Sequence, residues 1–265
     1  MKKRNFLCLV ALIGVGASLF AGCGFLKTFE RYENAQAYSA GNFTYQANAV
    51  TEIEIDWVDG KVEIVQSDNP TLSVFESLPA EANEDKVHYW LRGNTLKIAY
   101  CQSGKRGDIS QSNKELVVEI PSGVSLDIEA VGAEVTAQSL QVRSVSVDTK
   151  SGAVNGGVWR ADEVDVETES GSVRVDSIDA RDISVETESG SVAFAMVQNR
   201  AEIETARGSV EITLPQDLGA RIVFETTRGE FSSSREYSKN GSVYTIGGGE
   251  VALFVETTSG DLKVQ

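Results

Sequence analysis

The sequence predicts an all-β protein, a single-stranded β-solenoid with coils of about 19 residues and an irregular N-terminal cap. One phrase, roughly Val/Ile-x-Val/Ile-Asp/Glu-Thr-x-Ser-Gly-x-Val/Leu, recurs along the chain. Apolar residues alternate with polar ones on both sides of its Ser-Gly corner, as strands require. The corner positions are Ala133 (an imperfect copy), Gly152, Gly171, Gly190, Gly208, Gly229 and Gly260, at intervals of 19, 19, 19, 18, 21 and 31 residues.

The N-terminus carries an export signal. Three cations precede a mostly apolar run from Phe6 to Phe20 that is too short for a comfortable transmembrane helix, so residues 1–22 are predicted to be a signal peptide. Ala21-Gly22-Cys23 resembles the lipobox of bacterial lipoproteins, in which the Cys receives a lipid and becomes the new N-terminus. We therefore expect an extracytoplasmic protein, lipid-anchored to the bacterial cell membrane through Cys23. Phe20 departs from the usual aliphatic residue of a lipobox, and an ordinary signal peptide with an incidental Cys is the alternative.

Charge and cysteine content exclude several classes of protein. The chain has 24 Lys and Arg against 39 Asp and Glu, and loss of the signal leaves 21 cations. Nucleic acid is therefore excluded as a partner, whereas cations or basic proteins would be attracted. Cys8 leaves with the signal and Cys23 carries the lipid, so no disulfide framework is expected. Cys101 ends an alternating run and is predicted to be a packed, small apolar residue.

Two segments precede the regular repeats. Residues 23–49 lack strand alternation and are predicted to be a membrane-proximal tether, although Phe25, Leu26, Phe29 and Tyr32 have the spacing of a short amphipathic helix on lipid. Alternation starts near Val50, so the folded domain is expected over residues 50–265. Within it, the irregular cap over residues 50–113 includes a β-hairpin that turns at Arg92-Gly93-Asn94.

In the repeats, strand parity separates an inner face from an outer one. Val164, Val166 and Thr168 share one face and the acids between them the other. We expect coils stacked in parallel about 4.8 Å apart around an aliphatic core, with each corner Gly chosen for a backbone conformation that a β-carbon would hinder. An antiparallel meander is the rival architecture. The final copy is expected to be the last level of the stack. Its outer edge should be covered by the insertion of residues 232–249, which is favoured, or else by a partner.

The chain resembles a bacterial β-strand-repeat family of unknown function known as putative adhesins. The resemblance rests on Ile55 to Val62, on Val118 to Gly123, on the Thr-x-Ser-Gly copies and on the Gly-rich lead into the last copy, and it covers about residues 50 to 265. It implies a right-handed β-solenoid at the cell envelope. Some relatives are associated with envelope-stress signalling.

Catalytic and cofactor motifs are missing from the sequence. His88 is the single His, and no G-x-S-x-G, phosphate loop or C-x-x-C occurs, so we predict no enzyme, no cofactor and no metal site. The most suggestive feature is a column of acids before the repeated Thr. A solvated strand face, weak cation binding and a lyase-like catalytic face are the three interpretations, and the first is favoured because carboxylates about 5 Å apart in water repel by only about 0.8 kcal/mol. The column comprises Asp148, Glu167, Glu186, Glu204, Glu225 and Glu256.

Two further residue types invite a functional interpretation. The repeated Thr could contact glycans if it faced outwards, but its parity with the valines places it inwards or at the corner, where stacked hydroxyls can bond one another. Among the tryptophans, Trp57 and Trp90 are expected to pack near the N-terminal end. Trp159 is expected to be the best exposed platform for a sugar.

Together these observations predict a non-enzymatic, lipid-anchored envelope protein, an adhesin or surface-interaction scaffold. Its partners would be the membrane, through the N-terminal lipid, and an envelope protein or surface glycan. A stress or signalling accessory that docks on a membrane protein is the alternative, and a polysaccharide-acting β-helix enzyme is a remote one.

Overall fold

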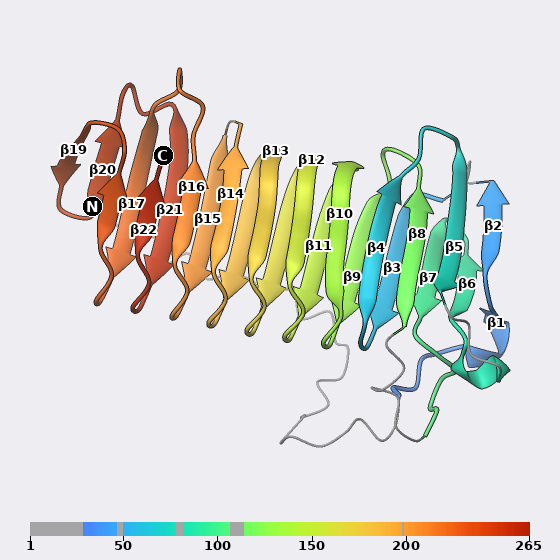
Figure 1. Ribbon diagram of the computed structural model, residues 1–265. Coiled ribbons are helices and arrows are strands. Elements are labelled where there is room, and N and C mark those ends of the chain that lie inside the picture. Colours follow the sequence, from blue (N-terminus) through green and yellow to red (C-terminus); the bar gives the residue numbers. More distant parts are fainter. Residues whose placement is uncertain (1–28, 47–49, 78–81, 107–113, 198) are drawn as a thin grey trace, which may run out of the picture.

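The computed structural model describes residues 29–265 apart from residues 47–49, 78–81, 107–113 and 198. The predicted signal peptide and Cys23 lie outside the described residues. The chain forms a long row of stacked strands without an α-helix in the described part, as Figure 1 shows. Two short 3-10 helices, η1 (Ala35–Ala37) and η3 (Asn83–Asp85), lie near the N-terminal end. The all-β solenoid prediction is thus confirmed. No helix of this described part is long and apolar enough to cross a membrane.

Each coil contributes one strand to each of two rows, and the buried side chains of both rows form one core. We call the row whose strands lead into the Thr-x-Ser-Gly corners the acidic row. In spatial order it comprises β1 (Ser39–Ala40), β6 (His88–Arg92), β7 (Thr95–Ala99), β3 (Glu52–Trp57), β9 (Ser125–Ala130), β11 (Ser144–Thr149), the ends of β12 (Val154–Thr168) and β13 (Val173–Thr187), β15 (Arg200–Thr205), β21 (Val251–Thr257), β17 (Ala220–Thr226), β20 (Val243–Ile246) and β19 (Tyr237–Asn240).

The second row runs beside it in the same order of coils. β12 and β13 belong to both rows because each continues through the bend between them. The second row comprises β2 (Phe43–Gln46), β5 (Thr71–Ser77), β8 (Glu115–Ile120), β4 (Lys61–Gln66), β10 (Glu134–Gln141), the starts of β12 and β13, β14 (Val192–Met196), β16 (Val210–Thr213), β22 (Leu262–Val264) and β18 (Phe231–Ser233).

The repeat register is kept along the middle of the stack. Val154 pairs in parallel with Val173, and Val173 with Val192, each 19 residues further on. Val154, Val164, Val166 and Val173 are fully buried, as their parity predicts. Parallel pairing excludes the antiparallel meander, because a meander would place consecutive strands in opposite directions.

At both ends the spatial order of coils departs from the chain order. The coil of β21 and β22 ends the chain, yet it lies between the coil of β15 and β16 and that of β17 and β18. The expectation that the final copy is the last level is therefore wrong. At the other end, the coil of β3 and β4 lies between that of β7 and β8 and that of β9 and β10.

Antiparallel strands finish the stack. The insertion does cover an edge, but β20 pairs with β17 rather than with the final copy, and β19 lies outside it (Figure 1). At the N-terminal end β6 pairs with β7 and β5 with β8, both antiparallel, and the predicted hairpin turns at Gly93, whose φ is +61°. β1 pairs with β6 and β2 with β5, again antiparallel, so β1 and β2 are the outermost strands of the two rows at this end. Residues 39–46 of the expected tether are thus part of the folded body.

Candidate functional site

The outer face of the acidic row carries a continuous ladder of carboxylates. Each member pairs with the next across the parallel strands, so neighbours are roughly 4.8 Å apart. Asp56 and Glu129 extend the predicted column. The sequence missed them because Trp57 and Ala130 stand where the later copies have Thr. In spatial order the ladder comprises Asp56, Glu129, Asp148, Glu167, Glu186, Glu204, Glu256 and Glu225.

Partial burial and neighbouring charges raise the pKa values of five carboxyl groups in this ladder. Loss of hydration, followed by the charge of Glu129, raises the pKa of Asp56 to about 7. The pKa values of Glu129, Asp148, Glu167 and Glu204 are also raised, first by partial burial and then by neighbouring carboxylates. All five move in the same direction. A catalytic acid and base pair needs environments that shift the two pKa values apart, and these five shifts all have the same direction.

A shallow groove of about 410 Å³ follows the ladder beside the corners. Its floor alternates between ladder acids such as Glu186 and corner residues such as Glu188. Within the described part of the chain, no group of three or more His, Cys, Asp or Glu side chains is arranged to hold a metal ion.

The repeated threonines hold the corners, and all of them except Thr226 are buried. Thr187 is buried, and its Oγ1 accepts a hydrogen bond of 2.9 Å from the Gly190 backbone N–H. The inward or corner placement is correct, but each described hydroxyl bonds the glycine of its own corner rather than the next hydroxyl. The same bond joins Thr149 to Gly152, Thr168 to Gly171, Thr205 to Gly208, Thr226 to Gly229 and Thr257 to Gly260.

The corner glycines are required by close approach rather than by an unusual φ. A β-carbon on Gly190 would lie 1.8 Å from the carbonyl oxygen of Gly171 in the neighbouring coil. None of the repeat corners has a positive φ. The prediction that a special backbone conformation requires glycine at the corners is thus wrong. Glycine is required because each corner stacks so closely on the next that a side chain has no room.

The tryptophans and the lone His offer no exposed recognition group. Trp159 is only 1% exposed and its Nε1 donates to the Ala137 carbonyl, so the prediction of an exposed platform is wrong. Gly156 makes room for its ring, since a β-carbon there would lie 2.5 Å from Nε1. Cys101 is buried and unpaired, as predicted, and burial raises its pKa to about 12. His88 is buried, with Nδ1 2.9 Å from the Lys86 carbonyl oxygen.

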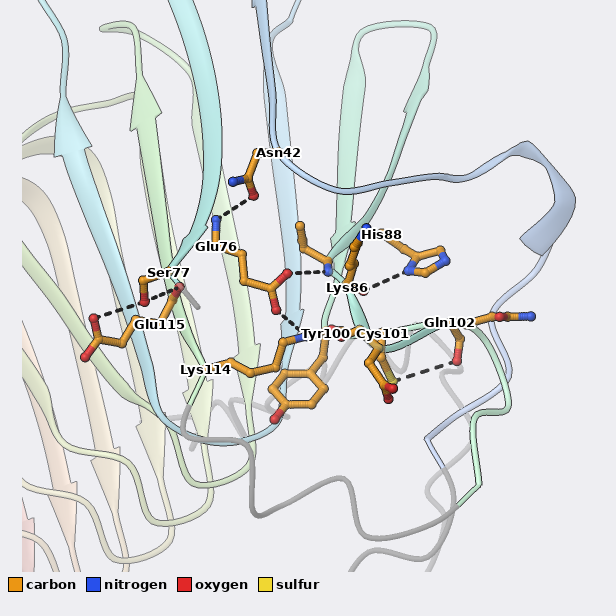
Figure 2. Close-up of polar contacts among 12 residues, drawn as sticks. Asn42, Glu76, Ser77, Lys86, His88, Tyr100, Cys101, Gln102, Lys114 and Glu115 are labelled. Carbon is orange, nitrogen blue, oxygen red and sulfur yellow. Dashed lines mark hydrogen bonds and ion pairs between the residues drawn. The ribbon is translucent and has the colours of Figure 1, made fainter. Parts of the chain in front are cut away.

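A buried ion pair at the N-terminal end has no counterpart among the sequence-based predictions. Figure 2 shows Lys114 pointing at Glu76, with Nζ 2.7 Å from Oε1 and both side chains at most 5% exposed. Nζ also donates to the carbonyls of Asp85 and Tyr100, and Glu76 Oε2 accepts the Val87 N–H. Desolvation lowers the pKa of Lys114. These bonds join β5 to the residues just before β6 and β8 and to the residue after β7, so the pair stabilises the fold at this end.

Comparisons with known proteins identify a family over more than half of the chain. The profile of the family described as Toastrack DUF4097 matches residues 50–200. No curated protein matches the chain. A "putative adhesin" from Parabacteroides distasonis is 15% identical, with a TM-score of 0.46, and the match covers 86% of this chain and 97% of that one. A "putative adhesin" from Bacteroides fragilis is 12% identical, at a TM-score of 0.44, over 86% and 97%. A "putative cell adhesion protein" from Clostridium sporogenes is 14% identical, at 0.37, over 85% and 99%.

Proposed function

This chain belongs to the Toastrack DUF4097 family, and we propose that it is a non-enzymatic, lipid-anchored envelope protein that presents its acidic row as a binding surface. The observation that carries the proposal is the ladder from Asp56 to Glu225, which lines up carboxylates along the stacked coils. A row of like charges on a strand face attracts a cationic partner over its length rather than a ligand at one point. The partner class is a basic segment of another envelope protein, or a surface glycan with cationic groups.

Anchoring is tested first, because the surface works in place only if the protein stays at the membrane. Cys23→Ser should move the protein from the detergent phase to the aqueous phase and release it from cells. Unchanged partitioning would refute lipid anchoring through Cys23. Phe20→Leu should speed the disappearance of the precursor in a pulse-chase. An unchanged rate would show that Phe20 does not slow lipoprotein processing.

The surface is tested by charge removal on one face at a time. Replacing Glu167, Glu186, Glu204 and Glu256 with Gln should abolish binding of cells to the partner surface, or crosslinking to the partner protein. The matched control removes four acids from the outer face of the second row, namely Glu63, Glu115, Glu134 and Glu211. Equal loss from both sets would show that only net charge matters and would refute the assigned face.

The two partner types give different cellular results. An adhesin predicts that anchored cells attach to a coated surface through this domain. An accessory of a signalling protein predicts crosslinks to one membrane protein and an altered stress response on deletion. The variant with Gln at the four ladder positions identifies the partner type. It should abolish cell attachment if the protein is an adhesin, and the crosslinks if it is a signalling accessory.

A further inference from the structure

The described chain enters the fold at the N-terminal end of the stack. Phe29 is buried there, its N–H donates to the Lys105 carbonyl at 2.7 Å, and its ring lies 6.3 Å from that of Tyr100. Only five residues lie between Cys23 and Phe29, and the six extended residue steps from one to the other reach about 20 Å. A lipid on Cys23 therefore keeps this end of the solenoid close to the bilayer.

The same end exposes two large aromatic side chains. Phe75 on β5 is 53% exposed and Tyr45 on the edge strand β2 is 43% exposed. Phe75 lies on the outer face opposite Val117 of β8 and lines a shallow groove of about 480 Å³. Tyr45 pairs with the buried Leu72, so it projects from the opposite face of the outermost strand. β2 and β5 are the outermost strands of the second row at this end, as Figure 1 shows.

We propose that this N-terminal end, which we call the foot, rests in the headgroup region of the membrane that holds the lipid, with Phe75 and Tyr45 as its contacts. The inference depends on the lipid anchor proposed above. Aromatic rings are favoured in the headgroup region of a bilayer. The short segment between Cys23 and Phe29 also keeps the foot at a high effective concentration near the membrane, so even a weak contact forms. The rod then stands away from the membrane, and the carboxylate ladder faces the surrounding space.

Charges near the foot determine which lipids it accepts. Glu115 and Glu119 flank Val117 on the exposed face of β8. Because acids repel an anionic surface, the contact is apolar, and the foot should prefer zwitterionic phosphatidylethanolamine and phosphatidylcholine to phosphatidylglycerol. A cationic patch is not required for this mode of contact.

The test places a spin label on the full lipidated chain in proteoliposomes of phosphatidylethanolamine and phosphatidylcholine. Ser73→Cys labels β5 beside Phe75, and Ser232→Cys labels β18 at the opposite end of the same row. Cys101 is buried and should not react. Eight strand-to-strand steps lead from β8 to β18 and span about 40 Å, so a standing rod keeps the second label out of the bilayer.

We expect collision with lipid-dissolved oxygen to rise several-fold at position 73 and to stay unchanged at position 232, relative to detergent-solubilised protein. Adding Phe75→Ser should remove most of the rise, and phosphatidylglycerol vesicles should weaken it. If both labels were equally exposed to water in a protein that still partitions as a lipoprotein, membrane contact by the foot would be refuted. Lipid anchoring through Cys23 would not be affected. Protection of position 73 only in native membranes would indicate a protein partner instead. Failure to partition would remove the anchor and the foot together.

Discussion

A threonine and a glycine three residues later determine the stability of each corner. Gly190→Ala should lower the free energy of unfolding by several kcal/mol, because its β-carbon would meet the Gly171 carbonyl at 1.8 Å. Thr187→Val removes the acceptor for the Gly190 N–H and should cost about 1–3 kcal/mol, whereas Thr187→Ser keeps the hydroxyl and should cost less. Urea unfolding measures all three, and a harmless Gly190→Ala would contradict the stacked corner.

The buried ion pair makes a second prediction at the scale of the residue. Lys114→Met leaves the Glu76 carboxylate buried without its cation and should cost about 3–5 kcal/mol. The double variant Lys114→Met with Glu76→Gln should recover a large part of that loss, since it removes both charges and keeps an acceptor for the Val87 N–H. Purely additive losses in a double-mutant cycle would show that the two side chains are not coupled.

At the scale of the element, strand parity decides which substitutions the coils tolerate. Val173 is 1% exposed at the start of β13, so Val173→Asp would bury an unpaired charge and should cost several kcal/mol. Glu167→Gln on the outer face of β12 should be nearly neutral. Thermal unfolding of both variants tests the assignment, and equal tolerance of the two changes would reverse it.

The β19–β20 hairpin protects the C-terminal edge of the acidic row. β20 pairs with β17, and Phe231 stacks on Tyr244 with ring centroids 3.9 Å apart. Deleting residues 234–247 with a short linker should expose the β17 edge and cause self-association, because an open strand edge accepts another chain. Light scattering tests this. A deletion variant as monomeric as its parent would show that the hairpin is not a protective cap.

At the scale of the whole molecule, the acidic ladder makes stability depend on pH. A carboxyl group whose pKa is raised in the folded state binds its proton more tightly when folded, so its charge destabilises the fold above that pKa. The destabilisation should decrease as pH falls from about 7, the pKa of Asp56, towards the ordinary carboxyl range near 4.

We therefore expect the melting temperature to rise by a few degrees, on the order of 1 kcal/mol, as pH falls from 8 to 5 at low salt. Added salt should reduce this gain. Replacing Asp56 with Asn and Glu129 with Gln should flatten the profile, and replacing Glu115 and Glu134 of the second row with Gln should not. A melting temperature that falls steadily over this interval in the parent would show that the ladder does not control the pH dependence.

The sequence alone determined the local features of this molecule. The 19-residue spacing and the alternation within each copy identified the strands, the buried valines and the outward acids from Asp148 onwards, because these depend on backbone periodicity within one coil. The packed Cys101 and the hairpin at Gly93 followed from equally short segments. The resemblance supplied the family, which the profile match confirmed.

Only the tertiary structure decided what depends on contact between distant segments. The insertion of the last coil between β15 and β17, and of β3 between β7 and β9, is set by pairing of strands far apart in the chain, which no local pattern encodes. The same holds for Trp159, whose ring fits over Gly156, and for Lys114 and Glu76, which meet across 38 residues. The physical reason is that strand pairing recognises shape and hydrogen bonds in three dimensions, so a coil takes the place that buries its faces best, whatever its place in the chain.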